Sequence, residues 1–323
     1  MRLDWPGALL IAVALGALQL FVEFLPKHGV TLSVCALLVL SVASAYGLWQ
    51  WEKRCPTAIL PVDMFRNPSL SALFTLAVLG GFTMFSLLFY APLLFQGGFG
   101  MSPKEAGLVI TPLVVFITIG SIANGHIVSR VRNPNLMLYI GFALVALACL
   151  GVVVATHSMP QWLLMSFMVL GGLGLGFVMP NLTIFAQQTA GREHLGIATA
   201  LLQSLRMIGG MIGTALTGTL VSHMYASGVR SALENDHASQ WFTDLGDPQI
   251  LINRDAQTTL LGQLQHAGHN GAMLLESARE SLVAAIHLGL AMAAIIAVVS
   301  VWQSRRVPPI KLQRKLEPVI HAD

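Results

Sequence analysis

The dominant pattern along this chain is a series of eight long apolar runs separated by polar stretches. Each run is close to, or longer than, the ~20 residues that a helix needs to cross a bilayer. We predict helices rather than strands, because an open sheet leaves backbone groups unpaired in lipid and the runs lack the alternation of a membrane barrel. The chain is therefore predicted to be an all-α polytopic membrane protein. The predicted spans are 5–25, 30–50, 69–96, 106–129, 136–156, 162–188, 196–223 and 281–303.

Composition supports this prediction and excludes several classes of function. Hydrophobic residues make up 55% and charged residues 10% of the chain, whereas about a quarter of the residues of a soluble domain are charged. The formal net charge of +3 is too small to indicate a nucleic-acid partner. The sequence lacks the G-x-x-x-x-G-K-[ST], H-E-x-x-H and G-x-S-x-G motifs, and His266 and His269 have no third ligand at a recognised metal spacing. We expect no enzyme activity, cofactor or metal.

The distribution of Lys and Arg predicts the orientation of the spans. Most basic residues outside the spans lie on the side that holds both termini, and an excess of basic residues marks the cytoplasmic side. Both termini are therefore predicted to be cytoplasmic. The polar stretches divide the chain into two helices at 1–51, a cytoplasmic connector at 52–68, a six-helix bundle at 69–303 and a basic cytoplasmic tail at 304–323.

The longest polar stretch lies between the seventh and eighth spans, at 224–280. It is rich in Asn, Gln, His, Asp and Glu, and the predicted orientation places it outside the cell membrane. Helical spacing at 255–266 and 272–279 predicts short helices within an otherwise looping segment.

The candidate functional chemistry centres on Arg206, which lies near the middle of the seventh span. A central Arg costs a membrane helix roughly 2.5–3.5 kcal/mol on insertion scales, so its side chain is expected to face protein or water. Gln203, Gly210, Gly213 and Thr217 share its helical face. Arg206 is either a charge beside a translocation pathway or a structural arginine that fastens helices. Because no Asp or Glu lies at mid-span, a carboxylate partner would have to come from elsewhere.

Small residues at helical spacing predict close helix packing in two spans. Gly209 and Gly213 form a G-x-x-x-G pair, with Gly210 beside them, and Gly172 and Gly176 repeat this spacing in the sixth span. Such pairs let another helix backbone approach closely. Asn181 follows in the same span. Its amide either lines a pathway or makes an interhelical hydrogen bond.

Several motifs resemble the 14-span drug:proton antiporters of the major facilitator superfamily, the QacA/EmrB type. The segment from Gly196, G-x-A-T-x-L-L-x-S-x-R-x-I-G-G-x-I-G, is similar to the penultimate span of that family, and WEKRCPTAILPVDMFRNPS is similar to its connector. GHIVSRVR, from Gly125, resembles the G-x-x-x-D-R-x-G motif. Here Gly125 and Arg130 match, while Ser129 replaces the acid and Arg132 the second glycine.

The resemblance implies two linker helices followed by the six-helix C-terminal bundle, which correspond to spans seven to fourteen. It further implies proton-coupled export of small amphipathic or cationic drug-like compounds across a bacterial-type inner membrane. An N-terminal half or a periplasmic adaptor would be partners. Because sites in such transporters form between two halves near the bilayer midplane, Arg206, Gln203, Asn181 and Thr111 would contribute one wall. The alternative is a non-transporting remnant or a membrane assembly partner.

Overall fold

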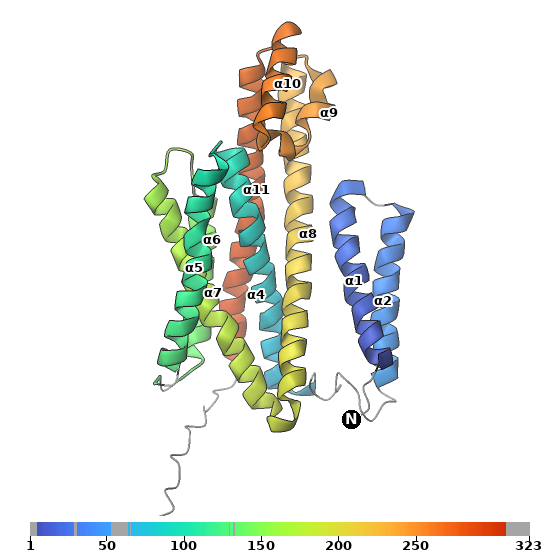
Figure 1. Cartoon of the computed structure of the whole chain (residues 1–323), viewed down its shortest axis with the longest axis vertical. Coiled ribbons are helices and arrows are strands. Elements are labelled where there is room, and N and C mark those ends of the chain that lie inside the picture. The colour runs from blue at the N-terminus through green and yellow to red at the C-terminus, as the bar shows by residue number, and fades with distance from the viewer. Residues whose placement is uncertain are drawn as a thin grey trace, which may run out of the picture.

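The computed structural model describes residues 5–28, 31–52, 64, 66–128, 130–131 and 133–307. This part of the chain is helical and contains no strand. It holds eight helices long and apolar enough to cross a membrane. They are α1 (Trp5–His28), α2 (Leu32–Glu52), α4 (Pro68–Leu93), α5 (Pro103–Val128), α6 (Leu136–Val153), α7 (Gln161–Ala190), α8 (Leu195–Asn235) and α11 (Gly271–Gln303) (Figure 1). The predicted fold class is confirmed. Ser129, most of the connector at 52–68 and the tail from 308 lie outside the described residues.

Local sequence signals set the starts of the bundle helices. At α4, the Asn67 side chain accepts hydrogen bonds from the backbone N–H groups of Ser69 (3.0 Å) and Leu70 (3.4 Å), and Pro68 occupies the first turn. At α5, the Ser102 backbone N–H donates to Glu105 Oε2 (2.8 Å), and the Glu105 N–H donates to Ser102 Oγ (3.3 Å). This reciprocal pair is a capping box.

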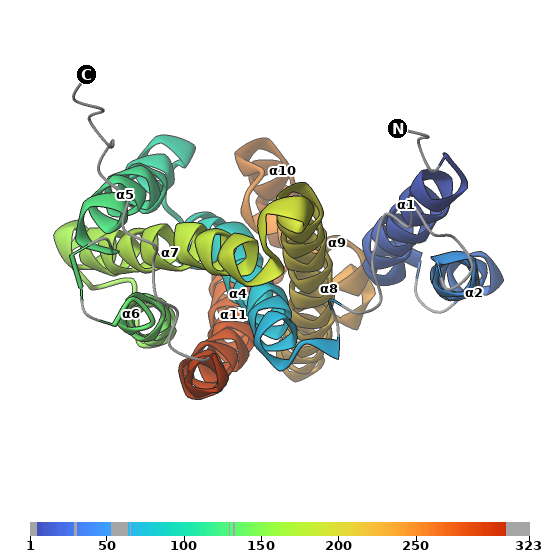
Figure 2. The ribbon, with the colours of Figure 1, turned by 90° about the horizontal axis from the view of Figure 1, so that it is seen from below.

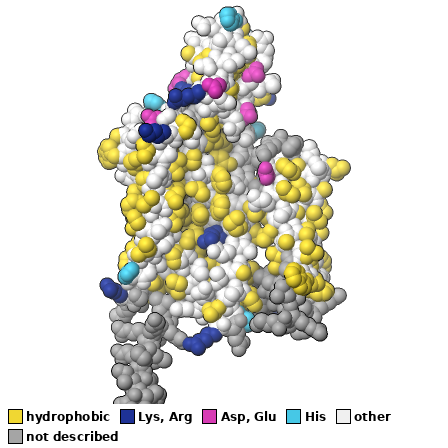
Figure 3. Space-filling view, viewed as in Figure 1, with side chains coloured by type: hydrophobic (Ala, Val, Ile, Leu, Met, Phe, Trp, Pro, Cys, Tyr) yellow, Lys and Arg dark blue, Asp and Glu magenta, His cyan; other side chains and the backbone are white. Residues whose placement is uncertain are grey.

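Six helices form the bundle. α7 lies between α5 and α6, α11 packs against α6 and α8, and α4 lies between α7, α8 and α11 (Figure 2). α1 and α2 form a separate hairpin, in which Ser41 Oγ donates to the Ala14 carbonyl at 2.9 Å. This hairpin meets the bundle where α1 packs against α8. The face seen in Figure 3 is largely apolar along the height of the spans.

The predicted loop at 224–280 is mostly helical, because the two long helices beside it extend into it. α8 continues twelve residues past the predicted end at 223, and α11 begins ten residues before the predicted start at 281. The expected helix at 255–266 is α10 (Arg254–His266), whereas 272–279 forms the first turns of α11. We call residues 224–280 the helical cap. Its remaining elements are η3 (Ser239–Trp241), α9 (Phe242–Leu245) and η4 (Pro248–Leu251).

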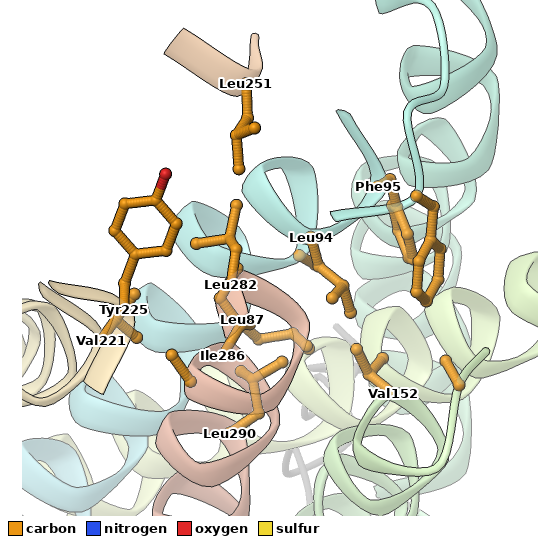
Figure 4. Close-up of a cluster of buried hydrophobic side chains, with 14 of the residues drawn as sticks. Leu87, Leu94, Phe95, Val152, Val221, Tyr225, Leu251, Leu282, Ile286 and Leu290 are labelled. Carbon is orange, nitrogen blue, oxygen red and sulfur yellow. The ribbon is translucent and has the colours of Figure 1, made fainter. Parts of the chain in front are cut away.

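A buried apolar cluster joins the helical cap to the bundle. The Tyr225 hydroxyl is buried and donates to the Leu245 carbonyl at 2.7 Å. Leu251 of the cap lies near Leu282 of α11, with Leu87 and Leu94 of the α4 region close by (Figure 4). α4 ends in a π-helical turn, η1 (Leu94–Gly98), which packs against α11. The cap is thus continuous with the core of the bundle.

Candidate functional site

The Arg206 side chain lies on α8 and reaches α7. Its Nη1 is 2.9 Å from the Met179 sulfur, and the side chain is partly buried. In the part of the chain that the structure describes, no carboxylate lies within ion-pair distance of this guanidinium. A thioether is a weak acceptor and carries no charge. The positive charge of Arg206 is therefore not neutralised by another described residue.

The backbone of α8 at Arg206 lies directly against α4. A Cβ added at Gly81 of α4 would overlap the Arg206 carbonyl oxygen, and a Cβ at Gly209 of α8 would overlap the Val78 carbonyl. At Gly213 an added Cβ would lie 2.8 Å from Phe82 Cα. We call Gly81, Gly209 and Gly213 the glycine seam. This seam fixes the position of Arg206 along the axis of α4, with its carbonyl opposite Gly81.

The remaining predicted packing glycines lie at similar contacts. Gly210 faces the Phe85 ring of α4, where an added Cβ would overlap the ring. On α7, a Cβ at Gly172 would overlap the Leu113 carbonyl of α5, and one at Gly176 would lie 2.6 Å from the Ile117 carbonyl oxygen. Two pairs of helices, α4 with α8 and α5 with α7, therefore approach closely through glycine.

Asn181 belongs to the contact between α5 and α7. Its side chain is fully buried, and Nδ2 donates to Asn124 Oδ1 at 2.7 Å and to the Phe177 carbonyl at 2.8 Å. Asn124 is also fully buried. Of the two uses that the sequence left open for Asn181, the geometry matches an interhelical hydrogen bond. The Asn181 side chain has no exposed surface in this structure.

Gln203 and Thr111 are both exposed. Gln203 lies on α8 one turn before Arg206, so these two side chains share a helical face. Thr111 lies on α5 and donates its hydroxyl to the Gly107 carbonyl of its own helix at 2.7 Å. The structure thus brings Gln203 near Arg206, while Thr111 occupies a different helix.

The cytoplasmic motif predicted near the end of α5 is only partly described. Gly125 and Arg130 are exposed, and no heavy atom outside its own helix lies within 4 Å of a Cβ added at Gly125. Ser129 lies outside the described residues. Among the described residues, Gly125 is therefore not a point of close contact between helices.

Sequence reasoning missed three residues that define this site. Asn124 is a polar residue within an apolar run, which is a signal that points to a buried partner. Gly81 follows Gly80 in the middle of a span, which is a signal for close packing. Met179 carries no such signal, because its contact with Arg206 depends on how α7 and α8 meet in three dimensions.

Comparison with protein families identifies the architecture. A family model described as Major Facilitator Superfamily matches residues 2–214, which is more than half of the chain. The chain belongs to the major facilitator superfamily. The matched residues run from the α1–α2 hairpin through α4, α5, α6 and α7 into α8.

Several relatives within the superfamily are drug-resistance proteins. The chain is 30% identical over 222 residues to the methylenomycin A resistance protein of Streptomyces coelicolor. This alignment covers 68% of this chain and 46% of that protein. It is 30% identical over 274 residues to the tetracenomycin C resistance and export protein of Streptomyces glaucescens. This alignment covers 84% of this chain and 49% of that protein. The chain thus spans about half the length of these relatives.

Among solved structures, the chain is similar to a bacterial homologue of the human lysosomal transporter Spinster in an inward-facing, unoccupied conformation. The two are 18% identical, with a TM-score of 0.49, and the match covers 92% of this chain and 68% of that chain.

Proposed function

We propose that this chain forms the C-terminal part, spans seven to fourteen, of a proton-coupled exporter of small amphipathic drug-like compounds in a bacterial inner membrane. Membership of the superfamily supports the assignment to transport. The names of the methylenomycin and tetracenomycin relatives support resistance and export as the direction of transport. The coverage of about half of each relative is consistent with a second half that completes the transporter.

The observation that carries this proposal is the position of Arg206. The sequence predicts Arg206 near mid-span, and its guanidinium lies beside Met179 with no carboxylate of the described residues within ion-pair distance. An unpaired charge at this depth is costly, so a complementary charge or water must reach it. In the proposed exporter, a carboxylate of the N-terminal half faces Arg206 across the interface between the two halves.

This arrangement gives a route to proton coupling. A guanidinium near a carboxylate favours its ionised form, and separation of the two favours protonation. Closing the two halves around Arg206 would therefore release a proton, and opening them would permit uptake. Gln203 and Thr111 supply exposed polar groups on the same half, while Asn181 keeps α7 against α5 during the rocking motion.

The proposal is tested by efflux of a fluorescent cation from cells that lack their own exporters. One strain expresses this chain alone, and a second expresses it joined to the part of the tetracenomycin C relative that the alignment leaves uncovered. We expect export from the second strain only, and its loss when a protonophore collapses the gradient. Failure of correctly inserted protein to export in either strain would favour the non-transporting remnant or assembly partner.

Arg206 provides the matched variants for this assay. Arg206→Gln should lower the rate of efflux at least about tenfold, since removal of the charge removes the partner of the carboxylate, and Arg206→Lys should retain part of the activity. Arg192→Gln is the control, because Arg192 is exposed in the turn before α8. Equal rates for Arg206→Gln and Arg192→Gln would remove Arg206 from the mechanism.

A further inference from the structure

A small pocket lies where the helical cap meets the turn between α4 and α5. It is formed by η1, by the α4–α5 turn (residues 99–102), by η4 and α10 of the cap and by the first turns of α11. Its volume is about 20 Å³, which is room for a water-sized group, since a water needs roughly 10–15 Å³. Arg254 and Arg279 are the charged residues that line it, and none of the lining residues is acidic. The pocket therefore has a positively charged lining.

The Arg279 guanidinium is held at this pocket with part of its hydrogen-bonding capacity unused. Its Nε is buried and has no hydrogen-bond partner among the described residues. A Cβ added at Gly100 would lie 3.5 Å from Arg279 Cζ, so the backbone of the α4–α5 turn lies against the guanidinium. Arg279 Nη2 is 3.5 Å from Gln257 Oε1 of α10, which is long for a hydrogen bond. A buried N–H group without a partner costs free energy, and a bound acceptor would remove that cost.

Two carboxylates lie near these arginines, but neither lines the pocket. Glu276 Oε2 is 3.7 Å from Arg279 Nη1, and the Glu276 side chain is 65% exposed. This separation exceeds the ~2.7–2.9 Å of a charge-assisted hydrogen bond. Glu105 interacts electrostatically with Arg254, but it is exposed and accepts hydrogen bonds from the Ser102 N–H and hydroxyl, both at 2.8 Å. Ion pairs at such exposed positions are weak, so a small anion in the pocket would meet two largely available guanidinium groups.

We propose that this pocket binds a small inorganic anion of the size of chloride, with Arg254 and Arg279 as its positive partners. The side-chain amides of Gln96 and Gln257 add neutral donors to the lining. The bound anion bridges α10 and α11 of the cap to η1 at the end of α4, so it fastens the helical cap to the α4–α5 turn. Arg206 does not line this pocket. Binding needs neither a proton gradient nor a second half, so this inference stands apart from the proposed export function.

The test measures thermal unfolding of the purified 323-residue chain in a neutral detergent at constant ionic strength, with sodium gluconate replaced stepwise by sodium chloride. Gluconate is too large for the pocket, whereas a ligand that binds only the folded chain stabilises it in a saturable way. At a chloride concentration tenfold above Kd, we expect the melting temperature to rise by about 3 °C. Bromide should act as chloride does, because both are single-atom anions of similar size. No rise, or a rise that continues linearly without saturation, would overturn the proposal.

Variants locate the bound anion. Arg254→Gln and Arg279→Gln should each reduce the chloride-dependent rise at least about twofold, because each removes one of the two charges. Arg254 is exposed, so its replacement decides the question even where Arg279→Gln fails to fold. Arg230→Gln is the matched control, since Arg230 is an exposed arginine of the helical cap that lies over the Phe242 ring and does not line the pocket.

The control separates a pocket from the general charge of the cap. An undiminished rise in Arg254→Gln, or an equal loss in Arg230→Gln, would contradict the site. Efflux plays no part in this measurement, so the two proposals fail separately.

Discussion

α8 meets its two neighbours in opposite ways. Against α4, the glycine seam brings the backbones together so closely that one added carbon at Gly81 or Gly209 would overlap a carbonyl oxygen. Against α1, the same helix leaves a cavity of about 640 Å³. The contrast indicates which contacts hold the bundle and which leave space between helices. We expect α4 and α8 to move as one unit, while the distance between α1 and α8 can vary.

The largest expected effect comes from breaking the glycine seam. Gly81→Leu would force the α4 and α8 backbones apart, because the added side chain meets the Arg206 carbonyl rather than a flexible side chain. We expect the free energy of unfolding to fall by about 3 kcal/mol or more. Denaturation of the purified chain in mild detergent, followed by tryptophan fluorescence, measures this change.

The control is a glycine on α1, the helix that faces α8 across the cavity. Gly16 is on α1, and no heavy atom lies within 4 Å of a Cβ added there. Gly16→Leu should leave stability unchanged or slightly higher, because glycine is a weak helix former. If Gly16→Leu were as damaging as Gly81→Leu, the distinction between the two sides of α8 would be wrong.

A smaller effect is expected at the second close pair, α5 with α7. Asn181→Leu would leave the buried Asn124 amide without its partner, which should cost about 2 kcal/mol of unfolding free energy. Replacing both residues by Leu should cost less than the sum of the two single changes, since no polar group is then stranded. Additive losses in the same denaturation assay would show that the two amides do not interact.

The smallest expected effect concerns a hydroxyl pair beside the glycine seam. Ser86 Oγ and Thr217 Oγ1 are buried and lie 3.2 Å apart between α4 and α8. A double-mutant cycle with Ser86→Ala and Thr217→Val should give a coupling energy of about 0.6 kcal/mol, the average for such bonds between membrane helices. A coupling as large as the loss in Gly81→Leu would mean that polar contacts, rather than close backbone packing, hold α4 to α8.

Hydropathy predicted the number and positions of the long helices well, but not where two of them end. The reason is that apolar composition reports where a segment meets lipid, whereas helix propagation depends on backbone hydrogen bonds and local packing. α8 therefore continues beyond the apolar run to Asn235, where the helical cap packs around Tyr225. The same reasoning explains why α11 begins at Gly271, before its apolar run.

The candidate site was predictable in its residues but not in its partners. The cost of a charge in lipid singled out Arg206, and G-x-x-x-G spacing singled out Gly209 and Gly213. The contact with Met179 depends on the crossing of α7 and α8, which no local pattern encodes. The cavity between α1 and α8 depends similarly on how the hairpin docks against the bundle.

The continuity of α8 has a mechanical consequence. At 1.5 Å per residue, its 41 residues form a rod about 60 Å long. If the rod pivots at its Leu195 end, a tilt of about 10° displaces its other end by about 10 Å, whereas Arg206 moves by only a few ångströms. A spectroscopic label at that far tip would magnify small rearrangements around the Arg206 guanidinium into readily measured displacements.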